Sequence, residues 1–306
     1  MVSKKGTAIK KWAPIYIMAA PGLLYLLINN YIPMLGLVTA FKKIDFRVGI
    51  FQSPWVGLDN FTYLFKTKDA FIITRNTIAY NVAFLIINTV LGVLFAIFIS
   101  DIKGRKSRKI YQTSILLPYL MSTVIISYIV YAFLSPDKGM VNKSVLPLFG
   151  KTPISWYMEP KYWPVILTFV NTWKGIGYGC LVYIAGISGI DPHYYEAARI
   201  DGASKWQQIC YITLPCLKQT VLTLNLLNIG KIFYSDFGLF FQVPMNSGAL
   251  YDVTNTIDTY VYRSLMELGN VGMASASGFY QSLVGFVLVI LTNLLVRKID
   301  KDSALF

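Results

Sequence analysis

The sequence predicts an all-α membrane protein in which six helices cross the bilayer. Of its 306 residues, 55% are hydrophobic and only 14% are charged, whereas about 25% of the residues of a soluble domain are charged. The apolar residues gather into long runs, and a helix needs about 20 mostly apolar residues to cross roughly 30 Å of hydrocarbon. Because this composition leaves too little polar surface for a soluble chain of this length, we expect a polytopic membrane protein.

Six segments are apolar enough and long enough to cross a bilayer. They are residues 12–40, 70–100, 110–134, 162–190, 220–242 and 273–296. The first contains Pro21 and Pro33, and the third contains Pro118. Proline is tolerated in a spanning helix when neighbouring groups satisfy the freed carbonyls. We therefore expect one six-helix transmembrane domain over residues 12–296.

The distribution of lysine and arginine predicts the orientation of these helices. Basic residues are about twice as dense in segments 1–11, 101–109, 191–219 and 297–306 as in segments 41–69, 135–161 and 243–272. Because basic loops favour the cytoplasmic side, we place the N-terminal segment, the tail and the loop 191–219 in the cytoplasm. The net charge of +13 then indicates contact with anionic membrane lipid rather than with nucleic acid.

The residue types that enzymes and metal sites require are scarce. His193 is the only histidine, which excludes His-paired nucleophiles and multi-histidine metal sites. Residues 150–152 (Gly-Lys-Thr) resemble the end of a phosphate-binding loop, but this chain has Val145 where such a loop needs a glycine. The glycines of 175–179 lie inside a predicted span, where small residues favour close helix packing. We expect this chain to have no catalytic residues and to bind no metal, cofactor or ATP.

The cytoplasmic loop 191–219 is predicted to contain two short helices joined by a glycine. Asp191 is a good N-cap and Pro192 a good first helical residue, and Gly202 allows a sharp reversal. Pro215 is expected to end the second helix.

The second helix of this loop is predicted to be amphipathic. Trp206, Ile209 and Ile212 recur at spacings of three residues and share one face. Such an element is suited to docking into a groove on a partner protein. It is equally suited to lying on the bilayer surface with its apolar face in lipid. The residues alone favour neither reading.

The same loop contains a motif that resembles a known family. Its members are Glu196, Ala197, Ala198, Gly202, Ile212, Leu214 and Pro215. Their spacing resembles the cytoplasmic motif of the permease subunits of binding-protein-dependent ABC importers. Segments 55–61, 76–77 and 236–240 resemble the maltose and oligosaccharide branch of that family.

The resemblance implies an assembly of several subunits. A second homologous permease would complete the membrane pathway, two cytoplasmic ATPases holding ATP-Mg would drive it, and an extracellular solute-binding lipoprotein would deliver the solute. The loop 191–219 would be the coupling element seated on one ATPase, with Glu196 paired to a basic residue there. The coupling residues expected from the motif are Glu196, Ala197, Ala198, Asp201, Gly202, Ala203, Ile212, Leu214 and Pro215, and helical spacing adds Trp206 and Ile209.

Polar side chains inside the fourth and fifth predicted spans are candidates for a solute pathway, because polar groups are costly in hydrocarbon. Asn171, Lys174 and Tyr178 fall within about 60° of one another on the fourth helix. A second polar stripe on the fifth helix consists of Asn225, Asn228, Lys231, Ser235 and Asp236. Two such stripes fit a pathway for a hydroxyl-rich solute. They also fit contacts that join helices or subunits, including a Lys–Asp pair.

Together, the resemblance and the polar stripes predict a permease that imports a carbohydrate through the bacterial cytoplasmic membrane. The expected solute is an oligosaccharide or a fragment of a polysaccharide. An importer of the same build for a glycerol phosphodiester or an amino acid remains open. A channel or carrier that works without ATP, and hence without these partners, also remains open.

Overall fold

A computed structural model of the chain describes residues 4–299, so most of the predicted tail 297–306 lies outside the described residues. This part of the chain is helical and contains no strand beyond one isolated bridge between Lys42 and Trp55. The all-α prediction is therefore confirmed. The longer helices are α1 (Lys4–Leu26), α3 (Lys68–Ser100), α4 (Arg105–Leu116), α5 (Thr123–Leu134), α7 (Trp163–Ser188), α10 (Leu214–Ile229) and α14 (Val271–Ile299). Shorter ones are α2 (Asp59–Lys66), α6 (Leu146–Leu148), α8 (Pro192–Ile200), α9 (Lys205–Gln208), α11 (Phe237–Gln242), α12 (Tyr251–Thr254) and α13 (Ile257–Met266).

Four of the predicted spans are continuous helices. Within the described residues, the helices long and apolar enough to cross a membrane are Trp12–Phe41, Lys68–Ser100, Pro160–Ser188 and Val271–Leu294. They correspond to the first, second, fourth and sixth predicted segments. The chain is therefore a multi-pass membrane protein.

The third predicted span, 110–134, is not one straight helix. It is broken into two apolar helical segments, Arg105–Leu120 and Thr123–Leu134, which are bent by 96° relative to each other. Pro118 lies in the last turn before the bend, where its ring and missing N–H disrupt regular helical bonding. The Ser122 hydroxyl then accepts a hydrogen bond from the Ile125 N–H at 3.3 Å and starts the new helix as its N-cap.

The fifth predicted span, 220–242, is also corrected by the structure. Helix α10 ends at Ile229, and α11 begins only at Phe237. The turn between them follows Gly230, and the Asp236 carboxylate caps α11 by accepting the Leu239 N–H at 3.1 Å. Neither helix reaches the length and apolarity of a span by itself.

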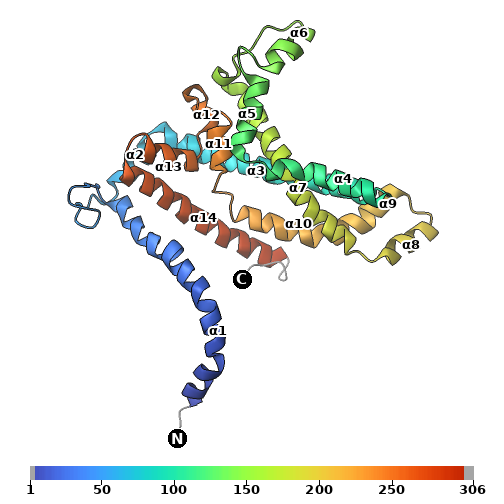
Figure 1. Cartoon of the computed structure of the whole chain (residues 1–306), viewed down its shortest axis with the longest axis horizontal. Helices are drawn as coiled ribbons and strands as arrows, with labels where there is room; N and C mark the ends of the chain where they lie inside the picture. The colour runs from blue at the N-terminus through green and yellow to red at the C-terminus, as the bar shows by residue number, and fades with distance from the viewer. Residues whose placement is uncertain (1–3, 300–306) are drawn as a thin grey trace.

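The helices form an elongated body with one end built around α8 and α9 (Figure 1). Its core contains the pair α3 and α7, which make the most extensive contact between two helices. Tyr80 and Phe84 of α3 pack there with Trp163 and Leu167 of α7 and with Phe240 of α11. Segment 135–162, which contains α6, projects from this body.

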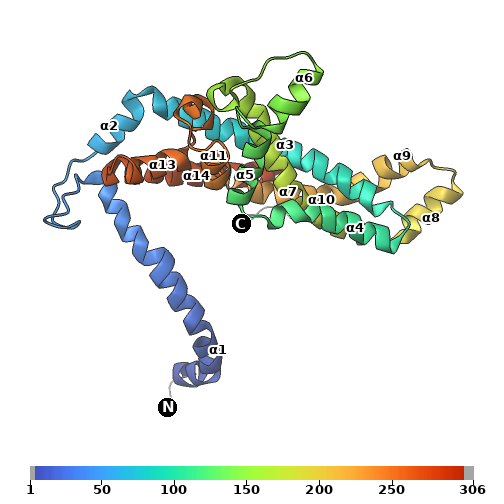
Figure 2. The ribbon, with the colours of Figure 1, turned by 45° about the horizontal axis from the view of Figure 1, so that its top comes forward.

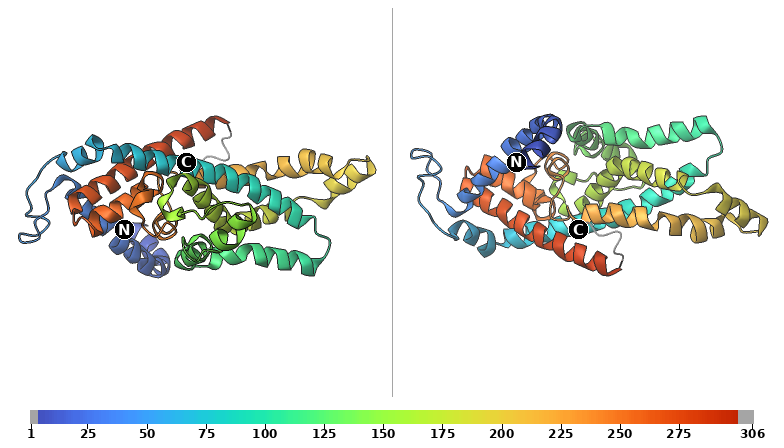
Figure 3. Two further views of the ribbon diagram at one scale, coloured as in Figure 1. Left: turned by 90° about the horizontal axis from the view of Figure 1, so that it is seen from above. Right: turned by 90° about the horizontal axis from the view of Figure 1, so that it is seen from below.

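Helix α1 projects away from the other helices (Figure 2). In the span Trp12–Phe41, only 11% of the most apolar stretch is buried, compared with 28% in Val271–Leu294. Seen from above and below, the α8–α9 end and the loop 42–58 lie at opposite ends of the body (Figure 3).

A buried polar cluster closes the end of the body near α12 and α13. Asn76 of α3 donates a hydrogen bond to the Asn255 carbonyl at 2.9 Å. Arg263 donates to the Asn255 side chain and stacks over the Tyr251 ring at 4.1 Å. Burial lowers the pKa of Arg263, and Tyr251 opposes this shift. These contacts hold the loop before α13 against α3.

Candidate coupling tip and polar cavity

The loop 191–219 folds locally as the sequence predicts. The Asp191 carboxylate accepts a hydrogen bond from the His193 N–H at 3.0 Å, so it caps α8, and Pro192 occupies the first turn. Helix α8 ends at Ile200. Gly202 then adopts φ +76°, a left-handed conformation that glycine adopts without the strain of a Cβ.

Helix α9 begins with a capping box. The Ser204 hydroxyl accepts the Gln207 N–H at 3.3 Å, and the Gln207 side chain accepts the Ser204 N–H at 2.7 Å. Each group satisfies a backbone donor that the helix itself leaves unpaired. The reversal at Gly202 is therefore followed immediately by a well-fixed helix start.

Pro215 does not end the second helix, contrary to the sequence prediction. Helix α9 passes into a wide π-helical turn at Ile209–Thr213 and then into α10. In a regular α-helix the Pro215 ring would clash with the carbonyl of Tyr211, four residues earlier. A π turn widens the helix at this point, so the helical run continues past the proline from 205 to 229.

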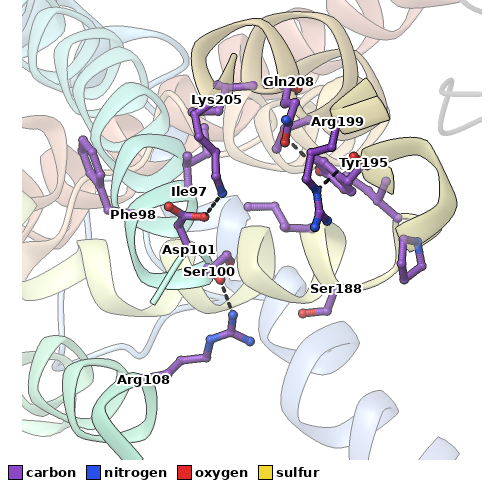
Figure 4. Close-up of a pocket in the computed structure, with 15 residues that line it drawn as sticks. Ile97, Phe98, Ser100, Asp101, Arg108, Ser188, Tyr195, Arg199, Lys205 and Gln208 are labelled. Atoms are coloured by element: carbon purple, nitrogen blue, oxygen red, sulfur yellow. Dashed lines mark hydrogen bonds and ion pairs between the residues drawn. The ribbon is translucent and has the colours of Figure 1, made fainter. Parts of the chain in front are cut away.

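One ion pair anchors this loop to the end of α3, and two hydrogen bonds brace the loop internally (Figure 4). Lys205 forms an ion pair with Asp101, at the end of α3. The Tyr195 hydroxyl is 2.9 Å from the Thr213 hydroxyl, and Arg199 donates to the Tyr195 carbonyl at 3.1 Å. These residues line a cavity of about 410 Å³ between α3, α7 and the loop. The loop is thus held as one unit on the helical body.

The end of this loop exposes large apolar side chains. Ile200 is 86% exposed and Trp206 is 70% exposed, and they flank the reversal at Gly202. Of the remaining candidates, Ala197, Asp201, Leu214 and Pro215 are exposed, and Ala198, Ala203, Ile209 and Ile212 are half-buried. We call Ile200, Gly202 and Trp206 the tip.

The tip differs from the apolar face predicted from helical spacing. Ile209 lines the anchoring cavity and Ile212 is half-buried, so these two residues do not extend an exposed stripe from Trp206. Ile200 was missed by the sequence analysis. A sequence pattern could have identified Ile200, because it is an isoleucine directly before the Asp-Gly reversal, on a short helix with charged residues.

Glu196 is exposed beside His193, on the outer surface of α8. The two side chains are 3.2 Å apart. A contact between two exposed polar side chains contributes little stability, so Glu196 is accessible to a cationic partner.

A polar cavity of about 320 Å³ lies between α3, α7 and the end of α10. Four of the predicted pathway residues line it: Asn171 and Tyr178 from α7, and Asn228 and Lys231 from α10 and the turn after it. The two predicted stripes therefore meet around one cavity.

The other four predicted pathway residues are occupied by contacts within the chain. Lys174 lies 3.6 Å from Asp236 and donates to Thr123 at 2.5 Å. Ser235 donates to Asp258 at 2.7 Å, and Asn225 accepts from Thr89 at 2.7 Å. Lys174 and Asp236 thus form the Lys–Asp pair that the sequence analysis considered as a joining contact.

Helix α3 supplies cavity residues that the sequence analysis missed. Asn81, Asn88 and Thr89 line the cavity, and Asn88 donates to the Asn171 side chain at 3.0 Å. The spacing of seven residues between Asn81 and Asn88 places both on one helical face. That pattern would have identified a third polar stripe. No group of three or more His, Cys, Asp or Glu side chains in residues 4–299 is placed to hold a metal ion.

Residues 88–301 match the family described as binding-protein-dependent transport system inner membrane component. The chain belongs to this family. The resemblance predicted from the motif at 196–215 is therefore confirmed, and this permease has the transport role that the motif predicts.

Similar proteins of known name place the permease in the sugar branch of the family. It is 31% identical to the polygalacturonan/rhamnogalacturonan transport system permease protein YteP of Bacillus subtilis (strain 168), over 94% of this chain and 89% of that protein. It is 25% identical to the trehalose/maltose transport system permease protein MalF of Thermococcus litoralis, over 94% of this chain and 93% of that protein.

A solved structure shares the fold of this permease. It is a bacterial ABC transporter involved in the import of the acidic polysaccharide alginate. The TM-score is 0.88 and the sequence identity 31%, over 97% of this chain and 100% of that chain. A further structure of an alginate transporter, in complex with a periplasmic protein bound to an alginate pentasaccharide, matches with a TM-score of 0.86.

Proposed function

We propose that this permease forms half of the membrane pathway of an ATP-driven importer for an oligosaccharide or polysaccharide fragment. Its relatives and structural neighbours are named for polygalacturonan, maltose and alginate transport, which supports a carbohydrate solute. An extracellular solute-binding protein delivers the solute, and the complex of the alginate transporter with its periplasmic protein supports this role. The polar cavity offers amide and hydroxyl groups that suit sugar hydroxyls.

The proposed topology has six crossings. Each of the four continuous spans makes one crossing. The bent pair α4 and α5 makes the fifth, and α10 together with α11 makes the sixth. The Lys205–Asp101 ion pair holds the tip beside the basic segment 101–109, so both belong to one side of the membrane. Positive charge favours the cytoplasmic side, so the tip and this basic segment are placed there. An even number of crossings then places both termini on the cytoplasmic side as well.

A second homologous permease is the proposed partner of α1. This helix projects from the body with its apolar side chains exposed, and a helix with a free apolar face packs against either lipid or protein. A pathway for a hydrophilic solute also needs a second wall, because the polar cavity opens at the surface of this chain.

The anchored tip carries the proposed coupling function. Two cytoplasmic ATPases bind and hydrolyse ATP-Mg, and one of them receives the tip in a surface groove. Because the tip is paired to the end of α3 through Lys205 and Asp101 and continues without a break into α10, movement of the ATPase is transmitted to the helices as a rigid displacement. Glu196, accessible on α8, would pair with a basic residue in that groove.

Ile200→Asp tests the docking of the tip. Burying an isoleucine at an interface contributes about 1.5–3 kcal/mol, and a buried aspartate would add a desolvation cost. We expect at least about tenfold weaker association with the ATPases, measured by co-purification from membranes. Leu148→Asp is the matched control, because Leu148 is 83% exposed on the projecting segment 135–162. Unchanged association in Ile200→Asp would contradict the coupling role.

Asn228→Ala and Asp236→Ala separate the two roles assigned to the polar stripes. Asn228 lines the cavity, so its alanine variant should lower solute transport severalfold at unchanged thermal stability. Asp236 pairs with Lys174 and caps α11, so its loss leaves the half-buried Lys174 without an anionic partner and should lower stability by about 1–3 kcal/mol. Transport assays and thermal unfolding of the purified complex measure the two effects. A loss of stability in Asn228→Ala would assign that residue to packing as well.

A carrier that works without ATP is the rival from another class. Reconstitution of the chain alone into liposomes distinguishes the two, since the importer needs its ATPases. Full uptake without nucleotide or partner subunits would overturn the proposed function.

A further inference from the structure

We propose that Lys231 is the charge-recognition residue of the polar cavity, and that the imported carbohydrate is an oligosaccharide containing uronic acids. This inference rests on the proposed function and names its substrate class. The side chain of Lys231 would bind the sugar carboxylate, and the surrounding amides would bind the hydroxyl groups.

Lys231 is the only charged residue among those that line the cavity, and none of the lining residues is acidic. The other lysine of the polar stripes, Lys174, is neutralised by Asp236 at 3.6 Å. None of the ion pairs found in residues 4–299 includes Lys231. A cation in the membrane region usually has an anionic partner, and here the solute can supply it.

The turn that carries Lys231 is fastened to α3. The Asn81 amide donates to the Ile232 carbonyl at 2.9 Å and to the Tyr234 carbonyl at 3.0 Å. The Lys231 N–H donates to the Asn228 carbonyl at 3.0 Å. The backbone at Lys231 is therefore fixed at the rim of the cavity, while its exposed side chain keeps the freedom to reach a carboxylate.

The remaining lining groups suit a polyhydroxylated solute. Asn88 and Asn228 provide amides, and Tyr178 provides a hydroxyl. The Asn88 Oδ1 has no hydrogen-bond partner in the structure, although its Nδ2 donates to Asn171. A sugar hydroxyl can donate to such an acceptor if the side chain shifts to admit it.

A carboxylate fits this cavity better than a phosphate does. Phosphate sites commonly use arginine forks or the free N–H groups of a helix N-terminus. The cavity lining contains no arginine and no first turn of a helix. One lysine among neutral amides instead matches one negative charge among many hydroxyls, as in a uronic acid.

The test uses cells of the native host, so that every partner subunit is present. The solutes are labelled uronate oligosaccharides released from pectin and alginate, and the same mixtures after chemical reduction of their carboxyl groups to neutral alcohols. Uptake is measured relative to a strain that lacks this chain. In the wild type we expect the acidic mixture to be taken up at least about tenfold faster than the reduced one.

Lys231→Gln should lower uptake of the acidic mixture about tenfold, which corresponds to about 1.4 kcal/mol. The same variant should change uptake of the reduced mixture less than about twofold. Lys231→Arg should retain most of the acidic uptake, since it keeps the charge. Lys151→Gln is the matched control, because Lys151 is an exposed lysine of the segment 135–162, outside both the cavity and the coupling loop.

Four results would overturn the inference. Preferential uptake of the reduced mixture by the wild type would do so while leaving carbohydrate import intact. An equal effect of Lys231→Gln on both mixtures, or no effect on either, would assign Lys231 to packing or to the membrane surface. Absence of uptake of both mixtures would overturn the inference, whereas the proposed import function is tested separately by the reconstitution in liposomes.

Discussion

Replacing Gly202 with isoleucine should lower ATP-driven transport about thirtyfold while leaving the protein inserted and folded. Gly202 adopts φ +76°, and a left-handed conformation costs a residue with a Cβ about 1–2 kcal/mol. The cost is highest for a β-branched residue. A cost of about 2 kcal/mol shifts an equilibrium roughly thirtyfold. Here it shifts the loop away from the reversal that Ile200 and Trp206 flank.

The strain in Gly202→Ile is purely conformational, because a Cβ at this position would meet no atom within 4 Å. Gly150→Ile is therefore a close control. Gly150 has φ +64° and equally open surroundings, but it lies in the projecting segment 135–162. Both variants should reach the membrane in normal amounts, and only Gly202→Ile should lose solute uptake and solute-stimulated ATP hydrolysis. Normal uptake in Gly202→Ile would remove the basis of the coupling proposal.

The coupling loop was the most predictable part of the fold because its determinants are local. An N-cap, a proline in the first turn and a glycine at the reversal act over a few residues, so Asp191, Pro192 and Gly202 predict the helix–turn–helix by themselves. The contact that anchors it, between Lys205 and Asp101, joins residues 104 positions apart. No pattern along the chain indicates that pairing.

The two predicted spans that the structure breaks, 110–134 and 220–242, show the limit of local sequence patterns. Pro118 predicts a disturbance of the helix, but the 96° bend also depends on the new N-cap at Ser122. The segment 220–242 is apolar enough to suggest one helix. It breaks instead after Gly230, and the carbonyls of that turn are held by Asn81, 151 positions away from Ile232.

The lining of the candidate cavity was predicted only in part, because helical periodicity is a local pattern. Helical periodicity identifies which polar residues share a face, so Asn171, Tyr178, Asn228 and Lys231 were found. Periodicity does not show which polar side chains are already paired. Only the three-dimensional arrangement separates Lys174, neutralised by Asp236, from Lys231.

Replacing Gly177 with alanine should destabilise the permease by about 3 kcal/mol, the upper end of the usual cost of overpacking. A Cβ on Gly177 would lie 2.2 Å from the Ile115 carbonyl oxygen and 2.8 Å from the Leu116 Cα. Both are backbone atoms of α4, so no side chain can move aside to relieve the clash. The helices α4 and α7 would have to separate at the turn that precedes the 96° bend.

The same helix provides two controls for Gly177→Ala. Gly175 and Gly179 lie two residues to either side, and a Cβ at either position would meet nothing within 4 Å. Alanine favours a helix interior over glycine by about 0.5–1 kcal/mol, so Gly175→Ala and Gly179→Ala should be neutral or stabilising. Thermal unfolding in detergent measures the contrast, with an expected fall of about 6–12 °C for Gly177→Ala alone. Equal behaviour of the three variants would mean that α4 and α7 do not approach at Gly177. The prediction that small residues pack helices together here would then lose its support.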